Sequence, residues 1–331
     1  MATTAQPPRT DPIPGNVDRL ERIFASATSK HEAHATANAV MDELGRSPEF
    51  LTAVLRRHIA KRGAFAAENY PVLSMMIASN PHFELVANAW IPMPDGDTDL
   101  STKAIHHHGE LLLTTSAAFG PGYDHWTFTT PRQVDAERDL WEMELLTHGR
   151  HKLHEVAFVD AYIAHLPMFP ASLSVTYCLW SSRSDTNWKD TLKRVPVLQR
   201  NSAKLRRAAT KVGLAKQLEL KNAEYFDFHP SPDGFVGMPE REEFQRGPNE
   251  DHLHSLFHVV QGTGNDALAP EIAARLDAEP PPNAALARRL LADLEAGTPI
   301  AGRLSPGHTD LPHANFRSAD IERALAARAA R

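Results

Sequence analysis

The residues most able to do chemistry in this sequence are its histidines. The chain has 18, and His106, His107 and His108 are consecutive. Successive side chains of a β-strand point to opposite faces, so on a strand His106 and His108 share one face and His107 points away. Two imidazoles on one face can bind the same metal ion, and a third ligand must come from another strand. The triplet therefore predicts part of a metal site, and the alternative is a polar turn before Gly109.

His165 is the predicted third ligand. It lies between two β-rich segments, residues 156–160 and 172–180, and so at the edge of a different strand. Glu110 lies two residues beyond His108 and shares the predicted face. We expect it either to compete as a carboxylate ligand or to act as a partner that holds a ligand imidazole in place.

Two other groups of histidines have regular spacing. His148, His151 and His154 are three residues apart, and on a strand the first two would face opposite ways, so we expect them in exposed turns. His254 and His258 have the i, i+4 spacing of helical metal ligands. Nothing near them completes a site, and they are expected on a helix surface or at an interface.

The composition favours a soluble globular protein with a small-molecule substrate. The 331 residues are 42% hydrophobic, and the net charge of -6 argues against a nucleic-acid partner. Cys178 is the single cysteine, which excludes an internal disulfide, a Cys-rich zinc site and an iron–sulfur cluster. The sequence shows no secretory signal and no stretch near the ~20 apolar residues of a membrane span. We expect a cytoplasmic protein with no membrane partner, and homo-oligomer formation stays open.

Four regions of the chain differ in composition and in the spacing of apolar residues. Residues 1–14 are predicted to be a flexible lead-in, and residues 15–65 have the apolar spacing of helices that pack on a barrel. Residues 66–185 contain many short β-rich runs without alternating helices, which predicts a mainly β antiparallel sandwich or barrel. Residues 186–331 are predicted to be a helical and irregular extension, with a basic amphipathic stretch at 204–220.

Three segments between about residues 70 and 182 resemble the thiol dioxygenases, the cysteine dioxygenase-like branch of the cupin superfamily. They are residues 70–73 leading to 83–92, the triplet at 106–108, and residues 156–165 followed by 170–177. The resemblance implies a cupin-type β-barrel (double-stranded β-helix) that binds iron(II) through His106, His108 and His165, with dioxygen as co-substrate. It also implies that Tyr177 faces the metal as an acid or hydrogen-bond donor, and that Glu110 or Asp160 holds a ligand imidazole.

The sequence departs from this family in the substrate pocket. Cysteine-oxidising members use an arginine near the position of Val72, and no arginine occurs here between Arg62 and Arg132. The cysteine that forms the family's thioether, shortly after the second histidine, is also missing. The departures predict an iron-dependent dioxygenase for a small molecule other than cysteine. Val72, Trp90 and Lys103 are the expected pocket residues, and Lys103, or Arg132 folding back, is the cation for a substrate carboxylate.

Two alternatives remain open at this stage. The first is a metal-dependent cupin isomerase, lyase or hydrolase that uses zinc, nickel or manganese as a Lewis acid. The second is a non-catalytic, ligand-binding cupin whose C-terminal half serves as an interaction module.

Overall fold

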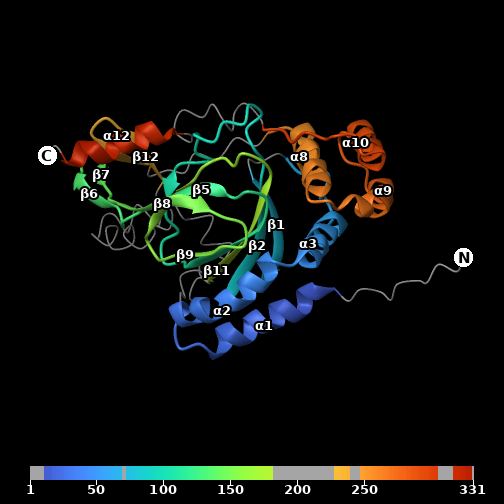
Figure 1. Ribbon diagram of the computed structural model, residues 1–331, viewed down its shortest axis with the longest axis horizontal. Coiled ribbons are helices and arrows are strands. Elements are labelled where there is room, and N and C mark those ends of the chain that lie inside the picture. Colours follow the sequence, from blue (N-terminus) through green and yellow to red (C-terminus); the bar gives the residue numbers. More distant parts are fainter. Residues whose placement is uncertain (1–10, 69–71, 182–226, 239–246, 305–315, 330–331) are drawn as a thin grey trace, which may run out of the picture.

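A jelly roll of antiparallel strands forms the centre of the computed structural model, which describes residues 11–68, 72–181, 227–238, 247–304 and 316–329. Helices from both ends of the chain cover it, with α1 to α3 on one side and α12 beside the strands at the opposite end from α8 to α10 (Figure 1). The chain is therefore mainly β in its central part and helical at both ends, as the sequence predicted.

Two curved sheets make up the barrel. The first has the order β1 (Val72–Ser79), β2 (Phe83–Trp90), β11 (Ser174–Ser181), β4 (Leu113–Phe119) and β9 (Val156–Val159). The second has the order β6 (Arg132–Asp135), β7 (Leu140–Glu142), β13 (Gly234–Met238), β12 (Asp227–Ser231), β3 (Ile105–His106), β10 (Ala164–Pro167), β5 (Tyr123–Phe128) and β8 (Leu145–His151). All the pairings between these strands are antiparallel.

The strand order identifies the barrel type. The chain crosses from one sheet to the other between β2 and β3, again to β4 and to β5, and the same alternation returns through β8, β9, β10 and β11. The two four-stranded halves, β2-β11-β4-β9 and β3-β10-β5-β8, are thus interleaved as in the jelly rolls of cupins. The prediction of a cupin-type β-barrel is confirmed.

The N-terminal helices cover the outer face of the first sheet. They are α1 (Pro12–Ser26), α2 (Lys30–Gly45) and α3 (Pro48–Ala60), and side chains of Asp11, Ser29 and Ser47 accept a hydrogen bond from the first turn of each. Their apolar side chains share one core with β1, β2 and β11. Because α1 starts at Pro12, the predicted lead-in is shorter than residues 1–14, and its first ten residues lie outside the described part.

The C-terminal region contains strands as well as helices, which corrects the predicted barrel boundary at residue 185. Strands β12 and β13 form a hairpin, and β12 pairs with β3, with Asp227 opposite His106. Helices α8 (Asn249–Gly262), α9 (Ala269–Ala278) and α10 (Ala284–Ala296) form a group in which α10 contacts both α8 and α9, and α9 contacts α3. Helix α12 (Ser318–Ala329) packs on the hairpin. The basic stretch at 204–220 lies outside the described residues.

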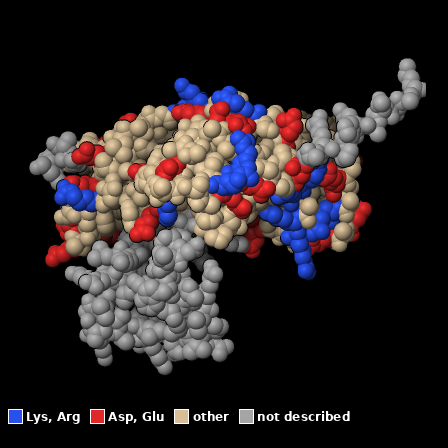
Figure 2. Space-filling view, turned by 90° about the horizontal axis from the view of Figure 1, so that it is seen from below, with Lys and Arg blue, Asp and Glu red and all other residues tan. Residues whose placement is uncertain are grey.

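Charged side chains of both signs are mixed on the face that Figure 2 shows, where Lys and Arg lie among Asp and Glu. Exposed ion pairs among the described residues include Arg57 with Asp11 at 2.7 Å and Arg56 with Glu271 at 2.8 Å. Among the described helices, none combines the length and the apolar character that crossing a membrane requires.

Candidate metal centre

Three histidines converge inside the barrel. His106 ends β3, and His165 on the neighbouring strand β10 lies directly opposite it in the register. His108 follows β3, and its Nε2 lies 3.3 Å from Nε2 of His165. One ring nitrogen from each of the three lies within 4.8 Å of the others. The structure therefore brings together the three histidines that the sequence selected.

His107 points away from this group, as strand alternation predicted. Its ring lies 6.2 Å from that of Phe228 and 5.8 Å from that of Tyr162, measured between ring centroids. Its Nδ1 accepts a hydrogen bond from the backbone of Gly109 at 3.0 Å, in a turn where that glycine has φ of 60°. The sharp turn redirects the chain immediately after His108.

Backbone carbonyl groups orient two of the imidazoles. Nδ1 of His106 lies 3.0 Å from the carbonyl oxygen of Ala104, and Nδ1 of His165 lies 3.5 Å from that of Ile163. A carbonyl oxygen only accepts, so these Nδ1 atoms carry the hydrogens and each Nε2 keeps its lone pair. Nε2 of His106 is buried and has no hydrogen-bond partner in the described part of the chain.

A metal ion fits this arrangement. Two imidazole nitrogens bound at about 2.1 Å to one ion, with an angle of roughly 90–110°, lie about 3.0–3.4 Å apart. The separation of 3.3 Å between His108 and His165 is of this size. A bound cation would also satisfy the lone pair of His106, which otherwise has lost its hydration without compensation.

The electrostatic surroundings keep His106 and His165 neutral, which is the form that binds metals. Burial lowers the pKa of His106 and of His165 well below the ordinary 6.5. The charge of Lys103 lowers the pKa of both further, so this ammonium group lies within electrostatic reach of the site.

Two predicted supporting carboxylates are placed elsewhere. The prediction for Glu110 was wrong because β3 stops at His106, and the turn at Gly109 breaks the alternation on which it depended. Glu110 is exposed and lies beside Tyr162, whose pKa is raised by burial and by this carboxylate. Asp160 forms an exposed pair with His31 at 2.8 Å. The carbonyl groups described above hold the imidazoles instead.

The placement of Tyr177 at the metal was also wrong. Its ring lies 5.3 Å from that of Phe50, in the core between the first sheet and the N-terminal helices. Its strand neighbours Cys178 and Trp180 face the barrel interior, and the Trp180 ring lies 4.2 Å from that of His108. Tyr177 therefore points away from the three histidines, and Trp180 is the residue of β11 whose ring contacts one of them, His108.

Two of the predicted pocket residues, Trp90 and Val72, lie on the face of the first sheet that points into the barrel. Nε1 of Trp90 donates a hydrogen bond to the hydroxyl of Thr176 at 2.9 Å, and its ring lies 4.8 Å from that of Tyr123. Val72 is opposite Trp90 in the register and shares its face.

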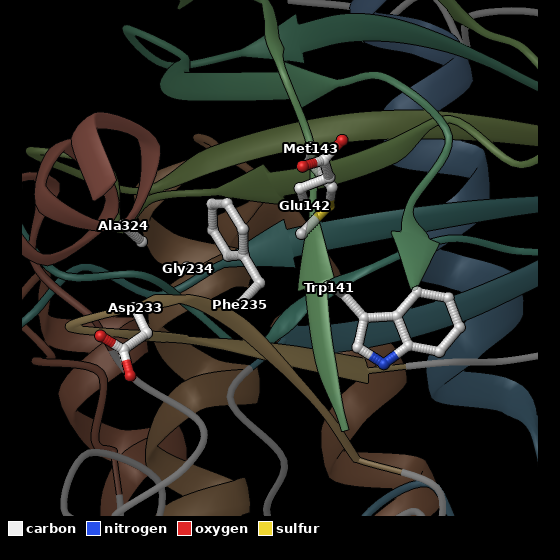
Figure 3. Close-up of a pocket in the computed structure, with 7 residues that line it drawn as sticks. All are labelled: Trp141, Glu142, Met143, Asp233, Gly234, Phe235 and Ala324. Carbon is white, nitrogen blue, oxygen red and sulfur yellow. The ribbon is translucent and has the colours of Figure 1, made fainter. Parts of the chain in front are cut away.

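A separate small pocket lies between β7, β13 and α12 and contains none of the three histidines (Figure 3). Its lining is Trp141, Glu142, Met143, Asp233, Gly234, Phe235 and Ala324.

The two other groups of regularly spaced histidines, on β8 and the turn after it and on α8, contact residues of the fold and not the three-histidine group. His148 is exposed on β8 and stacks on Trp126 at 3.7 Å, and His154 lies in a turn with φ of 64°. His151 contradicts the prediction of an exposed turn, because it is buried at the end of β8 with Nε2 3.0 Å from the Thr115 hydroxyl. On α8, Nδ1 of His258 contacts the carbonyl oxygen of Ile300 at 2.7 Å, and both ring nitrogens of His254 are buried.

The sequence reasoning missed His125, which lies next to the three histidines. Its ring centroid is 5.5 Å from that of His165, and burial lowers its pKa to about 3. Two-residue alternation along β5 could have found it, because Tyr123, His125 and Thr127 share one face while Trp126 and Phe128 belong to the core on the other face.

Comparisons with known proteins find no match in sequence, and matches to solved structures at low identity and low TM-score. No protein-family model matches the sequence, and a search of curated proteins finds no match. Among solved structures, a cupin-2 domain of Rhodospirillum rubrum is 15% identical, with 45% of this chain and 83% of that chain covered and a TM-score of 0.24. The cupin domain of Cnp3 from Schizosaccharomyces pombe is 7% identical, with 38% and 75% covered and a TM-score of 0.25. The ribosomal oxygenase YcfD from Escherichia coli is 12% identical, with 36% and 28% covered and a TM-score of 0.24.

The interleaved sheets define a cupin-type barrel, and its interior holds a three-histidine group that suits a metal ion.

Proposed function

We propose that this chain is a mononuclear non-haem iron(II) oxygenase, with His106, His108 and His165 as ligands and a small molecule other than cysteine as its substrate. The observation that supports this best is the convergence of three histidines, two of them held neutral by burial, in the barrel interior. Three neutral ligands on one side of an iron ion leave other coordination positions open. Bound iron(II) would supply the activation of dioxygen beside the substrate.

The protein's own residues would prepare this site in three ways. The carbonyl groups of Ala104 and Ile163 fix the imidazole tautomers. The Trp180 ring packs against His108 and limits its rotation. Lys103 would attract a substrate with a negative charge, since its field already acts on two of the ligand histidines.

A second candidate keeps the metal and omits the oxygen chemistry. Three histidines with an open fourth position also suit zinc, which would act as a Lewis acid in a hydrolase, lyase or isomerase. Nickel or manganese would serve the same role. Metal identity and oxygen uptake distinguish this candidate from the oxygenase.

Anaerobic reconstitution with iron(II) tests the ligand assignment. We expect about one iron per chain in the wild type by elemental analysis, and a large loss in His106→Ala and in His165→Ala. His148→Ala is the matched control, because that histidine is exposed and stacks on the outer face of its sheet. Unchanged iron in both ligand variants would refute the assignment. No stoichiometric metal in the wild type would favour a non-catalytic, ligand-binding cupin.

Oxygen uptake by the iron-loaded protein tests the reaction. A panel of amines, thiols, amino acids and aromatic acids is screened for substrate-dependent consumption, with the His106→Ala protein as the blank. Uptake that requires both substrate and His106 supports an oxygenase. Turnover without oxygen by the zinc-loaded or manganese-loaded protein would support the Lewis-acid candidate.

A further inference from the structure

We propose that His125 donates a hydrogen bond to the non-protein ligand that the metal ion carries, and so acts as a fourth, non-coordinating histidine of the site. The inference rests on the proposed metal centre and assigns a role to a residue outside the three ligands. It specifies that the incoming molecule presents an acceptor atom next to the metal, on the side of the barrel formed by β5 and β8.

His125 has the right position for this contact. It lies on β5 opposite Pro167 of β10, two register positions from the pair formed by Thr127 and His165. Its ring meets that of His165 edge to face, with 5.5 Å between centroids. It is not part of the group whose ring nitrogens lie within 4.8 Å of one another. His125 is thus close enough to reach a molecule bound at the metal and is placed outside the ligand set.

The ring nitrogens of His125 are available, in contrast to those of its neighbours. His106 and His165 each contact a carbonyl oxygen through Nδ1, and His151 contacts the Thr115 hydroxyl. Within the described part of the chain, neither nitrogen of the His125 ring has a hydrogen-bond partner, and the residue is only partly buried.

Open space lies beside the ring. On the other side of β5, His125 is paired with Gly149 of β8, and cross-strand partners point to the same face of a sheet. A Cβ atom added at Gly149 would meet nothing within 4 Å. Gly149 does not have a positive φ, so the backbone does not require glycine there. The missing side chain leaves room for a small ligand next to the imidazole.

Azide binding to the cobalt(II)-loaded protein tests the proposal. Azide is a small anionic acceptor, and its binding to cobalt changes the visible spectrum. Cobalt content and azide affinity are measured for the wild type, His125→Ala, His125→Gln and Gly149→Leu, with His148→Ala as the control. Circular dichroism and thermal unfolding confirm that each variant folds, and His125→Gln keeps a side chain of similar polarity if His125→Ala does not fold.

We expect His125→Ala to retain one cobalt per chain and to bind azide about ten- to a hundredfold more weakly, which corresponds to one lost hydrogen bond to a charged group. His125→Gln should recover part of the affinity. Gly149→Leu keeps the imidazole but fills the space beside it, and should also weaken azide binding. Full cobalt content with wild-type azide affinity in His125→Ala would overturn the proposal, and so would loss of cobalt, which would make His125 a ligand. Failure of the wild type to bind cobalt would instead refute the metal centre itself.

Discussion

Burial of an uncharged histidine at the helix-sheet interface predicts a measurable pH dependence of stability. His34 on α2 is fully buried, its Nδ1 lies 2.9 Å from the Thr114 hydroxyl, and its ring meets that of Phe24 edge to face at 5.3 Å. Burial, followed by the charges of His31 and Lys30, lowers its pKa from 6.5 to about 4. The perturbation that tests this is His34→Gln.

The sign follows from proton linkage. A lowered pKa means that the folded chain binds fewer protons than the unfolded chain, so stability falls as the pH falls. The contribution of His34 is fully present above pH 6.5 and is lost progressively towards pH 4. The two pKa values correspond to a loss of about 2 kcal/mol between pH 7 and pH 5, and of about 3 kcal/mol by pH 4.

Urea unfolding at several pH values between 7 and 4.5 measures the effect. Other buried histidines, including His58 and His107, contribute to the total slope, so the informative quantity is the difference between the wild type and His34→Gln. The variant is expected to lose about 2 kcal/mol less than the wild type between pH 7 and pH 5. His82→Gln, at an exposed position, is the control for the substitution itself. Equal slopes for the wild type and His34→Gln would show that burial does not keep this imidazole neutral.

Four further substitutions test particular contacts. Tyr177→Phe removes a buried hydroxyl that has no partner among the described residues, so the free energy of unfolding should stay the same or rise by about 1–3 kcal/mol, with metal content unchanged; a large loss of metal would contradict its placement in the core. In Gly45→Ala the added Cβ would collide with the Ser116 side chain, so the free energy of unfolding measured by chemical denaturation should fall by about 1–3 kcal/mol. In Gly15→Ala the added Cβ meets nothing within 4 Å, so helix α1 should be stabilised by roughly 0.5–1 kcal/mol. Trp180→Ala removes the ring packed on His108 and should weaken metal binding about 10–100-fold in a competition titration, with an unchanged fold; equal affinity would show that the ring does not position the ligand.

The histidine group could be predicted because strand alternation is a local rule. His106 and His108 needed only their two-residue spacing, and His107 does point away. Glu110 failed because the same rule holds only while the strand continues, and a turn at Gly109 ends it. The sequence contains that glycine, but its spacing does not show whether the strand ends before it or after it.

Tyr177 failed for a different physical reason. The sequence shows which side chains of a strand point to which face only when one face is polar and the other apolar. In β11 seven of the eight residues are buried, so both faces are covered. One face packs on helices and the other lines the barrel, where Thr176 and Cys178 lie on the same side as Trp180. The more polar face is the interior one, which is the reverse of an ordinary sheet. Hydropathy therefore could not decide which side chains of β11 face the metal.

The position of the ligand strand depends on pairings between segments that are distant in sequence. Strand β3 has only two residues, too few to hold an imidazole in place by itself. It lies between β10, which carries His165, and β12, where Asp227 pairs with His106 and Phe228 with Ile105. Phe228 is fully buried in the core that lies outside this sheet. The hairpin of residues 227–238 therefore supports His106 from the side opposite to His165, and the C-terminal region is part of the architecture of the candidate metal centre.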